Sequence, residues 1–235
     1  MDGRRRPRAA FFDAGNTLLR MDYAAIARAV RRHGPRVSAA ALERAEWRAR
    51  VRLDDEVLAA TAVSTESGAT GDRYLQLLLE EIGVTDAQIV QAVEAWRRDF
   101  NPPVGVWGRA DPRAAAALTA AREAGLVVGV ISNSNGSARG ILESVGLAAH
   151  VHFVLDSFEE GVEKPDPRIF GIALERAGVR ADEAVYVGDL YSVDVLGARG
   201  AGIDAVLLDP GRHWGIRDCR TAPNVLAAVR LLLSD

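Results

Sequence analysis

The stretch Phe11-Phe12-Asp13-Ala14-Gly15-Asn16-Thr17-Leu18 decides how the rest of this sequence is interpreted. It follows Ala9 and Ala10, so the chain is apolar from residue 9 up to Asp13. A short, continuous apolar run is typical of a parallel strand that is buried on both faces. Ligands of open α/β sheets bind beyond the carboxyl ends of such strands. We therefore predict that Asp13 is the reactive group at the end of a first strand, residues 9–13.

Further apolar runs have the same character, and helical patterns separate them. One helix start is marked by Asp166-Pro167, a capping aspartate before a proline, and Gly178 marks the end of that helix. Strands that alternate with helices predict an α/β fold with a Rossmann-like parallel sheet. The other strands are expected at Leu126–Ser132, Phe153–Asp156, Ala184–Gly188 and Ala205–Leu208.

The segment from Asp22 to Phe100 departs from this alternation, because it contains no strand signal and is dominated by Ala, Leu, Arg and Glu. Residues of this kind favour helices. Asn101-Pro102-Pro103 ends the segment, as expected of a linker. We therefore predict an α/β catalytic core formed by residues 1–20 and 101–235. A mainly helical domain, residues 21–100, is inserted after the first strand.

Charge and composition exclude several classes of protein. The 235 residues carry a net charge of −3, and the one basic run, Arg4 to Arg8, is short, so we expect no binding of nucleic acid. No segment reaches the roughly 18 apolar residues of a membrane span. Cys219 is the single cysteine, so it cannot form an internal disulfide. We expect a cytoplasmic protein that does not bind membranes, and the sequence leaves open whether it is a monomer or a homodimer.

Polar side chains also follow the later strands, and the carboxyl ends of parallel strands meet at one edge of a sheet. Carboxylates gathered there would repel one another without a cation, and Mg²⁺ prefers carboxylates, water and a substrate phosphate. A metal ion and a lysine together would neutralise a phosphoryl group, which lets an anionic aspartate attack it. The residues concerned are Ser132 and Asn133, then Lys164, then Asp189 and Asp194.

Each of these residues also has a simpler interpretation. Ser132 and Asn133 are common turn formers. Asp194 would be favourable at a helix N-terminus for electrostatic reasons alone. Lys164 precedes Pro165, which favours an extended backbone, and its side chain could face solvent. The combination of the four segments in order is more specific than any one of them.

In the order and spacing of these four motifs, and in the helical insertion, the chain resembles the haloacid dehalogenase-like hydrolase superfamily over nearly its whole length. Most members are Mg²⁺-dependent phosphatases, and the insertion resembles their cap domain. The resemblance implies hydrolysis of a small phosphorylated metabolite through a phospho-aspartate. It implies that Asp13 is the nucleophile, oriented by Lys164, and it also implies the binding residues. These are Asn16, Ser132, Asn133 and Lys164 for the phosphoryl group, and Asp13, Gly15, Asp189 and Asp194 for Mg²⁺.

Gly15 departs from the family pattern, because phosphatases of this family usually carry a second aspartate two residues after the nucleophile. That aspartate protonates the leaving oxygen and later activates water, and losing such a group commonly costs about 10²–10⁴ in rate. We hypothesise a slow phosphatase, a phosphatase for good leaving groups such as those of acyl phosphates or anhydrides, or an enzyme whose acid/base comes from the cap or the substrate. Asp22 and Tyr23 are nearby in sequence.

Two rival functions remain open at this stage. One is cleavage of another bond, carbon–halogen or carbon–phosphorus, on the same scaffold. The phosphonate-cleaving relatives usually use a cap lysine, whereas Lys164 is the only lysine of this chain. The other rival is a phosphate-binding protein that has lost turnover through Gly15.

Overall fold

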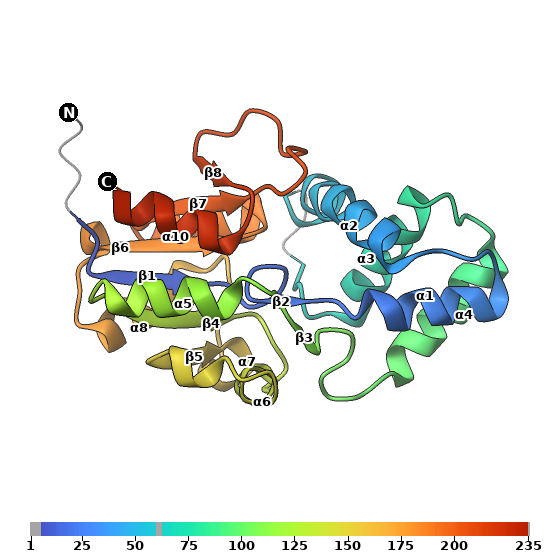
Figure 1. Cartoon of the computed structure of the whole chain (residues 1–235), viewed down its shortest axis with the longest axis horizontal. Coiled ribbons are helices and arrows are strands. Elements are labelled where there is room, and N and C mark those ends of the chain that lie inside the picture. Colours follow the sequence, from blue (N-terminus) through green and yellow to red (C-terminus); the bar gives the residue numbers. More distant parts are fainter. Residues whose placement is uncertain (1–5, 60–62, 235) are drawn as a thin grey trace. The chain divides into compact units, whose positions relative to one another are not determined.

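The structure, a computed structural model, describes residues 6–59 and 63–234. Arg4 and Arg5 of the basic run lie outside the described residues. The chain divides into two compact units. One consists of the described residues up to Arg20 together with those from Arg109 onward, and the other is Met21–Gly108 (Figure 1).

The first unit is built on a six-stranded parallel sheet in the order β5-β4-β1-β6-β7-β8. This confirms the predicted α/β fold with a Rossmann-like sheet. Two strands match the predicted bounds and three differ by one residue at one end. The sixth strand was not predicted. The strands are β1 (Ala9–Phe12), β4 (Val127–Ser132), β5 (Phe153–Asp156), β6 (Ala184–Gly188), β7 (Asp204–Leu208) and β8 (Arg220–Ala222).

Helices α5 and α10 pack beside each other in front of the sheet in Figure 1, and α8 packs beside α9. Asp166 caps α8 by accepting the N–H of Arg168, and Gly178 ends it in the left-handed conformation, φ 63°. These ends confirm the predicted start and stop signals. The α-helices of this unit are α5 (Ala114–Glu123), α6 (Ala138–Ser144), α7 (Ser157–Glu160), α8 (Pro167–Ala177), α9 (Leu196–Gly200) and α10 (Val225–Ser234).

A two-stranded antiparallel ribbon joins the points at which the chain leaves and re-enters the first unit. It pairs β2 (Leu19–Arg20) with β3 (Arg109–Ala110). Each strand has only two residues, too few to show a period in the sequence. The ribbon holds the end of the loop that begins at Asp13.

The regular elements among the described residues of the second unit are all helices, and turns and irregular segments join them. Asp22, Ser38, Ser67 and Asp86 cap its helices through their side chains. Residues 101–108, which the sequence assigns to the core, lie with this unit. The reason is a tertiary contact, because the Val106 carbonyl accepts the N–H of Asp22 at 2.7 Å and the Val106 side chain packs against the helical core. The helices are α1 (Tyr23–His33), α2 (Ala39–Leu53), a π-helical turn (Asp54–Leu58), α3 (Gly68–Glu81) and α4 (Ala87–Asp99).

The interior of the helical unit contains a buried ion pair. Glu46 on α2 has no exposed surface, and Arg50, one turn later, is 3% exposed. The Arg50 Nε donates to Glu46 Oε1 at 2.7 Å, and its Nη2 donates to Oε2. The hydroxyls of Tyr23 and Tyr74 donate to the same carboxylate. This charged group is therefore enclosed and hydrogen-bonded on both oxygens.

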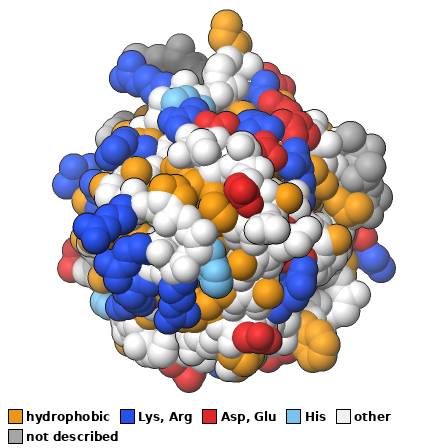
Figure 2. All heavy atoms as spheres, turned by 90° about the vertical axis from the view of Figure 1, so that its right-hand side faces the viewer, with side chains coloured by type: hydrophobic (Ala, Val, Ile, Leu, Met, Phe, Trp, Pro, Cys, Tyr) orange, Lys and Arg blue, Asp and Glu red, His pale blue; other side chains and the backbone are white. Residues whose placement is uncertain are grey.

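The surface of the helical unit is more polar than its interior. Helix α1 carries the exposed side chains of Arg28, Arg31 and Arg32. On the face of the molecule drawn in Figure 2, apolar side chains are scattered among charged ones. Of the helices that the structure describes, none combines the length and the apolar character that crossing a membrane requires.

Candidate functional site

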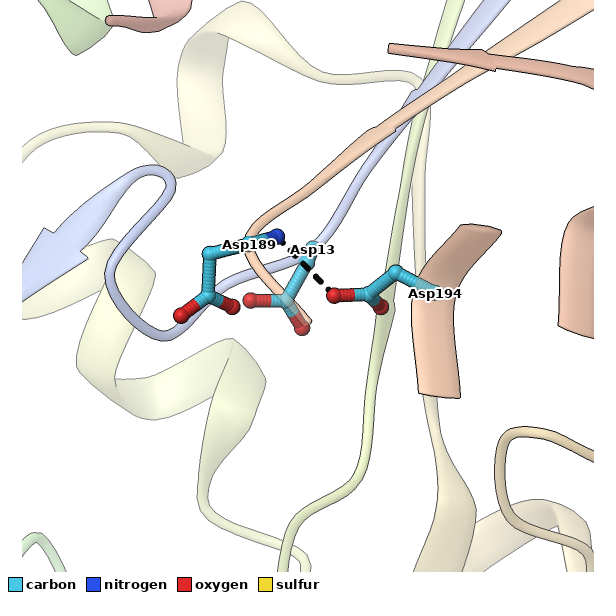
Figure 3. A group of neighbouring side chains, drawn as sticks. All are labelled: Asp13, Asp189 and Asp194. Atoms are coloured by element: carbon cyan, nitrogen blue, oxygen red, sulfur yellow. Dashed lines mark hydrogen bonds between the residues drawn. The ribbon is translucent and has the colours of Figure 1, made fainter. Parts of the chain in front are cut away.

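Three carboxylates converge at the carboxyl edge of the parallel sheet (Figure 3). Asp13 directly follows β1, Asp189 follows β6, and Asp194 lies in a π-helical turn, Tyr191–Val195. Strands β1 and β6 are neighbours, and the N–H of Asp13 continues their pairing by donating to the Val187 carbonyl at 2.9 Å. One oxygen from each carboxylate lies within 4.8 Å of the others. The sheet topology therefore brings together groups that are up to 181 residues apart in sequence (13 to 194).

Asp194 is fixed by four hydrogen-bond donors. Its Oδ2 accepts the N–H groups of Asp189 at 3.0 Å and Leu190 at 2.9 Å. Its Oδ1 accepts from Lys164 Nζ at 2.8 Å and from the Tyr186 hydroxyl at 3.1 Å. A Cβ on Gly188 would lie 2.4 Å from the Asp194 carboxyl carbon, so only glycine allows this close approach. Asp194 thus holds the loop that carries Asp189.

Lys164 is the cation of the site, and it is 3% exposed. Its Nζ donates to Asp13 Oδ1 at 2.6 Å, as well as to Asp194 and to Tyr186. Asn133 holds its main chain, because Asn133 Nδ2 donates to the Lys164 carbonyl at 2.9 Å and Asn133 Oδ1 accepts the Lys164 N–H at 2.8 Å. The side chain of Asn133 therefore sets the position of Lys164 opposite Asp13.

Ser132 ends β4, the strand next to β1, and Asn16 lies in the loop that follows β1. The Ser132 hydroxyl is buried at the end of β4 and donates to the Asn133 carbonyl at 3.2 Å. Asn16 has a positive φ of 49°, which asparagine tolerates better than most residues. Its Nδ2 donates to Asp189 Oδ2 at 3.1 Å. The structure thus directs the amide of Asn16 to a carboxylate of the site.

Tyr186 and Asp156 contribute to the site although the sequence analysis did not select them. Tyr186 is a hydroxyl-bearing residue inside the otherwise apolar run of β6, and that contrast was the available signal. Asp156 ends β5 and accepts the N–H groups of Gly136 and Ala138, which are both 3.1 Å away. It therefore fixes the loop that follows Ser132. The sequence feature that could have pointed to Asp156 is a carboxylate at the end of a predicted strand, the same feature that selected Asp13.

Asp22 and Tyr23, the nearby residues considered as an acid or base, both lie in the helical unit. Asp22 caps α1 by accepting the N–H of Ala25 at 2.8 Å. The Tyr23 hydroxyl is buried against Glu46. Both side chains therefore have structural partners.

Burial and charge set the protonation of the site. Burial raises the pKa of Asp13 from 3.8 to about 6, although the ammonium of Lys164 opposes this shift. For Lys164, burial alone lowers the pKa, but the carboxylates of Asp13 and Asp194 outweigh it and the pKa is raised. Burial, reinforced by the charge of Asp194, raises the pKa of Tyr186 well above 10. At neutral pH the site therefore combines a mostly ionised Asp13, the ammonium of Lys164 and the neutral phenol of Tyr186.

The donor set fits a divalent cation. Three carboxyl groups lie beside one ammonium, so at their formal charges the buried site has two more negative than positive groups. Carboxylate oxygens are hard ligands of the kind that Mg²⁺ takes, usually together with water and a substrate phosphate. Asp13, Asp189 and Asp194 are the groups of the described chain that could hold such an ion.

The amino-acid sequence is similar to those of known proteins. A family model for the haloacid dehalogenase-like hydrolases matches residues 7–202. The human haloacid dehalogenase-like hydrolase domain-containing protein 3 is 34% identical over 236 residues, covering 94% of this chain and 90% of the human protein. A phosphoserine phosphatase of Thermus thermophilus is 38% identical over 152 residues, covering 64% of this chain and 59% of that protein.

A solved structure extends the likeness to the fold. The 2-haloacid dehalogenase of Pseudomonas syringae has a TM-score of 0.57 and 27% sequence identity, with 97% of this chain and 98% of that chain covered. The family model spans most of the chain, and the human relative matches almost end to end. This chain belongs to the haloacid dehalogenase-like hydrolase family.

Proposed function

We propose that this protein is a Mg²⁺-dependent phosphatase of a small phosphorylated metabolite, acting through a covalent phospho-Asp13. The observation that carries the proposal is the buried contact of 2.6 Å between Asp13 Oδ1 and Lys164 Nζ, next to the carboxylates of Asp189 and Asp194. A nucleophilic carboxylate needs such positive charge in order to approach a phosphoryl group. Membership of a hydrolase family with a phosphoserine phosphatase among its relatives supports the same reaction class.

The first half of the reaction forms a bond between Asp13 and phosphorus. Lys164 holds Oδ1, which leaves Oδ2 to attack phosphorus while the bond to the leaving oxygen breaks. The positive charge of Lys164 offsets the negative charge of the phosphoryl group through space, and the Ser132 hydroxyl donates to a phosphoryl oxygen. The leaving oxygen departs with a proton from solvent, substrate or the helical unit, because Gly15 offers no side chain.

The second half regenerates Asp13. Water attacks phosphorus, the bond between phosphorus and the Asp13 oxygen breaks, and inorganic phosphate leaves. A bound Mg²⁺ would supply Lewis-acid stabilisation of the phosphoryl charge. Asp13, Asp189, Asp194 and the Gly15 carbonyl would hold it, and Asn16 would orient Asp189 through the contact between their side chains.

Substrate selection would come from the helical unit, Met21–Gly108, acting as a cap domain. Caps exclude water and choose the substrate in enzymes that close over a reacting group. We propose a small soluble metabolite as the partner, rather than nucleic acid or a membrane, and a cytoplasmic location.

The test is a screen of phosphorylated metabolites with the purified protein, with phosphate release measured in the presence of Mg²⁺ and then of EDTA. We expect release from at least one metabolite, a loss of about 10²-fold or more with EDTA, and recovery when Mg²⁺ is restored. Phosphate release that is unchanged by EDTA would contradict the role of the metal.

A second candidate is carbon–halogen cleavage. It is favoured by the 27% identity to a 2-haloacid dehalogenase and by the absence of an aspartate at position 15. The surplus negative charge of the site argues against it, because a metal-free reaction would leave that charge uncompensated. Halide release from a 2-haloacid in the presence of EDTA would select this candidate over the phosphatase.

Gly15 offers a direct test of the missing acid/base. Gly15 is not among the described glycines with positive φ, so an aspartate there would not meet the backbone strain of the left-handed region. We expect Gly15→Asp to raise turnover of alkyl phosphomonoesters by at least about tenfold, because these leaving groups need a proton. Acyl phosphates, whose leaving groups do not, should change little. The comparison is kcat for both classes.

Gly15→Asn is the matched control, since it adds a side chain of the same shape without an acid. If the aspartate and asparagine variants have equal turnover on both substrate classes, a missing proton donor is not what limits the enzyme.

A further inference from the structure

We propose that Tyr186 is a positioning residue that fixes the ammonium of Lys164 against the nucleophile. Tyr186 lies in the middle of β6 and has no exposed surface. Its hydroxyl lies 2.8 Å from Lys164 Nζ, 3.1 Å from Asp194 Oδ1 and 3.4 Å from the Ile131 carbonyl. Its phenol oxygen therefore contacts the lysine directly, and the lysine in turn contacts Asp13.

The hydrogen-bond count explains why this contact matters. A lysine ammonium has three N–H donors and no acceptor. Lys164 has three acceptors within 2.8 Å, which are Asp13 Oδ1, Asp194 Oδ1 and the Tyr186 oxygen. Each donor has one acceptor, so rotation of the ammonium would break all three bonds. Without the Tyr186 hydroxyl, the two carboxylates would leave one N–H donor of Lys164 without an acceptor in this network.

The proton of Tyr186 has a defined place in the same network. Because its oxygen accepts from Lys164, its own O–H must donate elsewhere. Asp194 Oδ1 and the carbonyl of Ile131 on β4 are the two acceptors in reach. Tyr186 therefore links Lys164 to the carboxylate that holds the Asp189 loop.

Packing keeps the phenol in place. The ring of Tyr186 meets the ring of Phe170 on α8 edge-to-face, with centroids 5.1 Å apart. Lys164 Nζ lies 5.4 Å from the Tyr186 ring centroid. Tyr186→Phe would preserve both ring contacts and remove only the oxygen. The variant thus separates the hydroxyl from the packing of the side chain.

The consequence for turnover rests on the proposed phosphatase function. With one donor of Lys164 undirected, its bond to Asp13 Oδ1 is less well oriented, and so is the attacking Oδ2. We expect kcat to fall about tenfold in Tyr186→Phe while KM changes by less than about threefold. A loss confined to kcat is typical of an interaction made in the transition state.

The positioning itself is tested without any substrate. Lys164 is the only lysine of the sequence, so nitrogen-15 lysine labelling gives one ammonium resonance. In the wild type we expect a single, slowly exchanging signal. In Tyr186→Phe the signal should shift, and its protons should exchange at least about tenfold faster. Tyr74→Phe is the control, because it removes a tyrosine hydroxyl that is bonded to the Glu46 carboxylate instead.

Each outcome decides the matter. An unchanged lysine signal in Tyr186→Phe overturns the proposal, as does a shifted signal with unchanged kcat in an active enzyme. Failure of Tyr186→Phe to fold while Tyr74→Phe folds also overturns it, because the hydroxyl would then be a structural requirement. If no phosphorylated substrate is turned over by the wild type, the proposed function fails, whereas a changed lysine signal still supports the contact.

Discussion

Asp13→Asn is expected to lower phosphatase turnover by at least about 10³-fold, because the amide cannot attack phosphorus. The substitution also removes the anionic partner of Lys164, which lies 2.6 Å away. The side chain keeps its shape, so the effect should appear in kcat rather than in folding. The measurement is kcat on the best substrate of the metabolite screen, together with the thermal midpoint of each protein.

Asp182→Asn is the matched control, since it is the same chemical change at an exposed aspartate just before β6. It should retain wild-type turnover. If Asp13→Asn retained turnover within about tenfold of the wild type, Asp13 would not be the nucleophile and the proposed mechanism would fail.

Glu46→Leu is expected to lower the free energy of unfolding of the helical unit by about 3–5 kcal/mol. The leucine would leave Arg50 charged and buried, and the hydroxyls of Tyr23 and Tyr74 would lose their acceptor. Urea denaturation followed by tryptophan fluorescence suits this unit, because three of the four tryptophans belong to it: Trp47, Trp96 and Trp107.

Two further variants separate the buried charge from other effects. Arg44→Gln changes an exposed residue of the same helix and should alter stability by less than about 0.5 kcal/mol. Glu46→Leu combined with Arg50→Leu should recover much of the loss, since no charge is then left uncompensated. If the double variant were less stable than Glu46→Leu, the loss of stability in Glu46→Leu would not come from the buried charge of Arg50.

The strands that carry the site were predictable from the sequence for a physical reason. Strands buried on both faces must be apolar throughout, so β5 and β6 stand out as runs with sharp ends. The polar residues just beyond those ends, such as Asp189, are then directed to one edge by parallel topology alone. The fold and the position of the candidate nucleophile follow from these two rules.

The short strands could not be predicted in the same way. The β2–β3 ribbon has two residues per strand, and β8 is an edge strand of three residues with an arginine and a threonine. Such segments pair because the surrounding chain brings them together, and no periodic pattern records this. The start of the core after the helical unit also depended on tertiary contacts, those of Val106.

The hydrogen-bond partners of individual side chains could not be predicted from the sequence either. Asn133 follows Ser132 and resembles a group that contacts a ligand, yet its amide binds the main chain of Lys164. That pairing joins residues 31 positions apart. It depends on how the loops after two adjacent strands meet. The role of Tyr186 could not be predicted for the same reason, because it depends on the contact of its hydroxyl with Lys164.

The most direct test of the central claim is to trap the covalent intermediate during turnover. With a substrate labelled in its phosphoryl group, acid quenching should leave the label on the peptide that contains Asp13. Since Gly15 provides no base to activate water, we expect the phospho-enzyme to accumulate and to be cleaved by hydroxylamine, as an acyl phosphate is. Turnover with no label on Asp13, or with the label on another residue, would contradict the account.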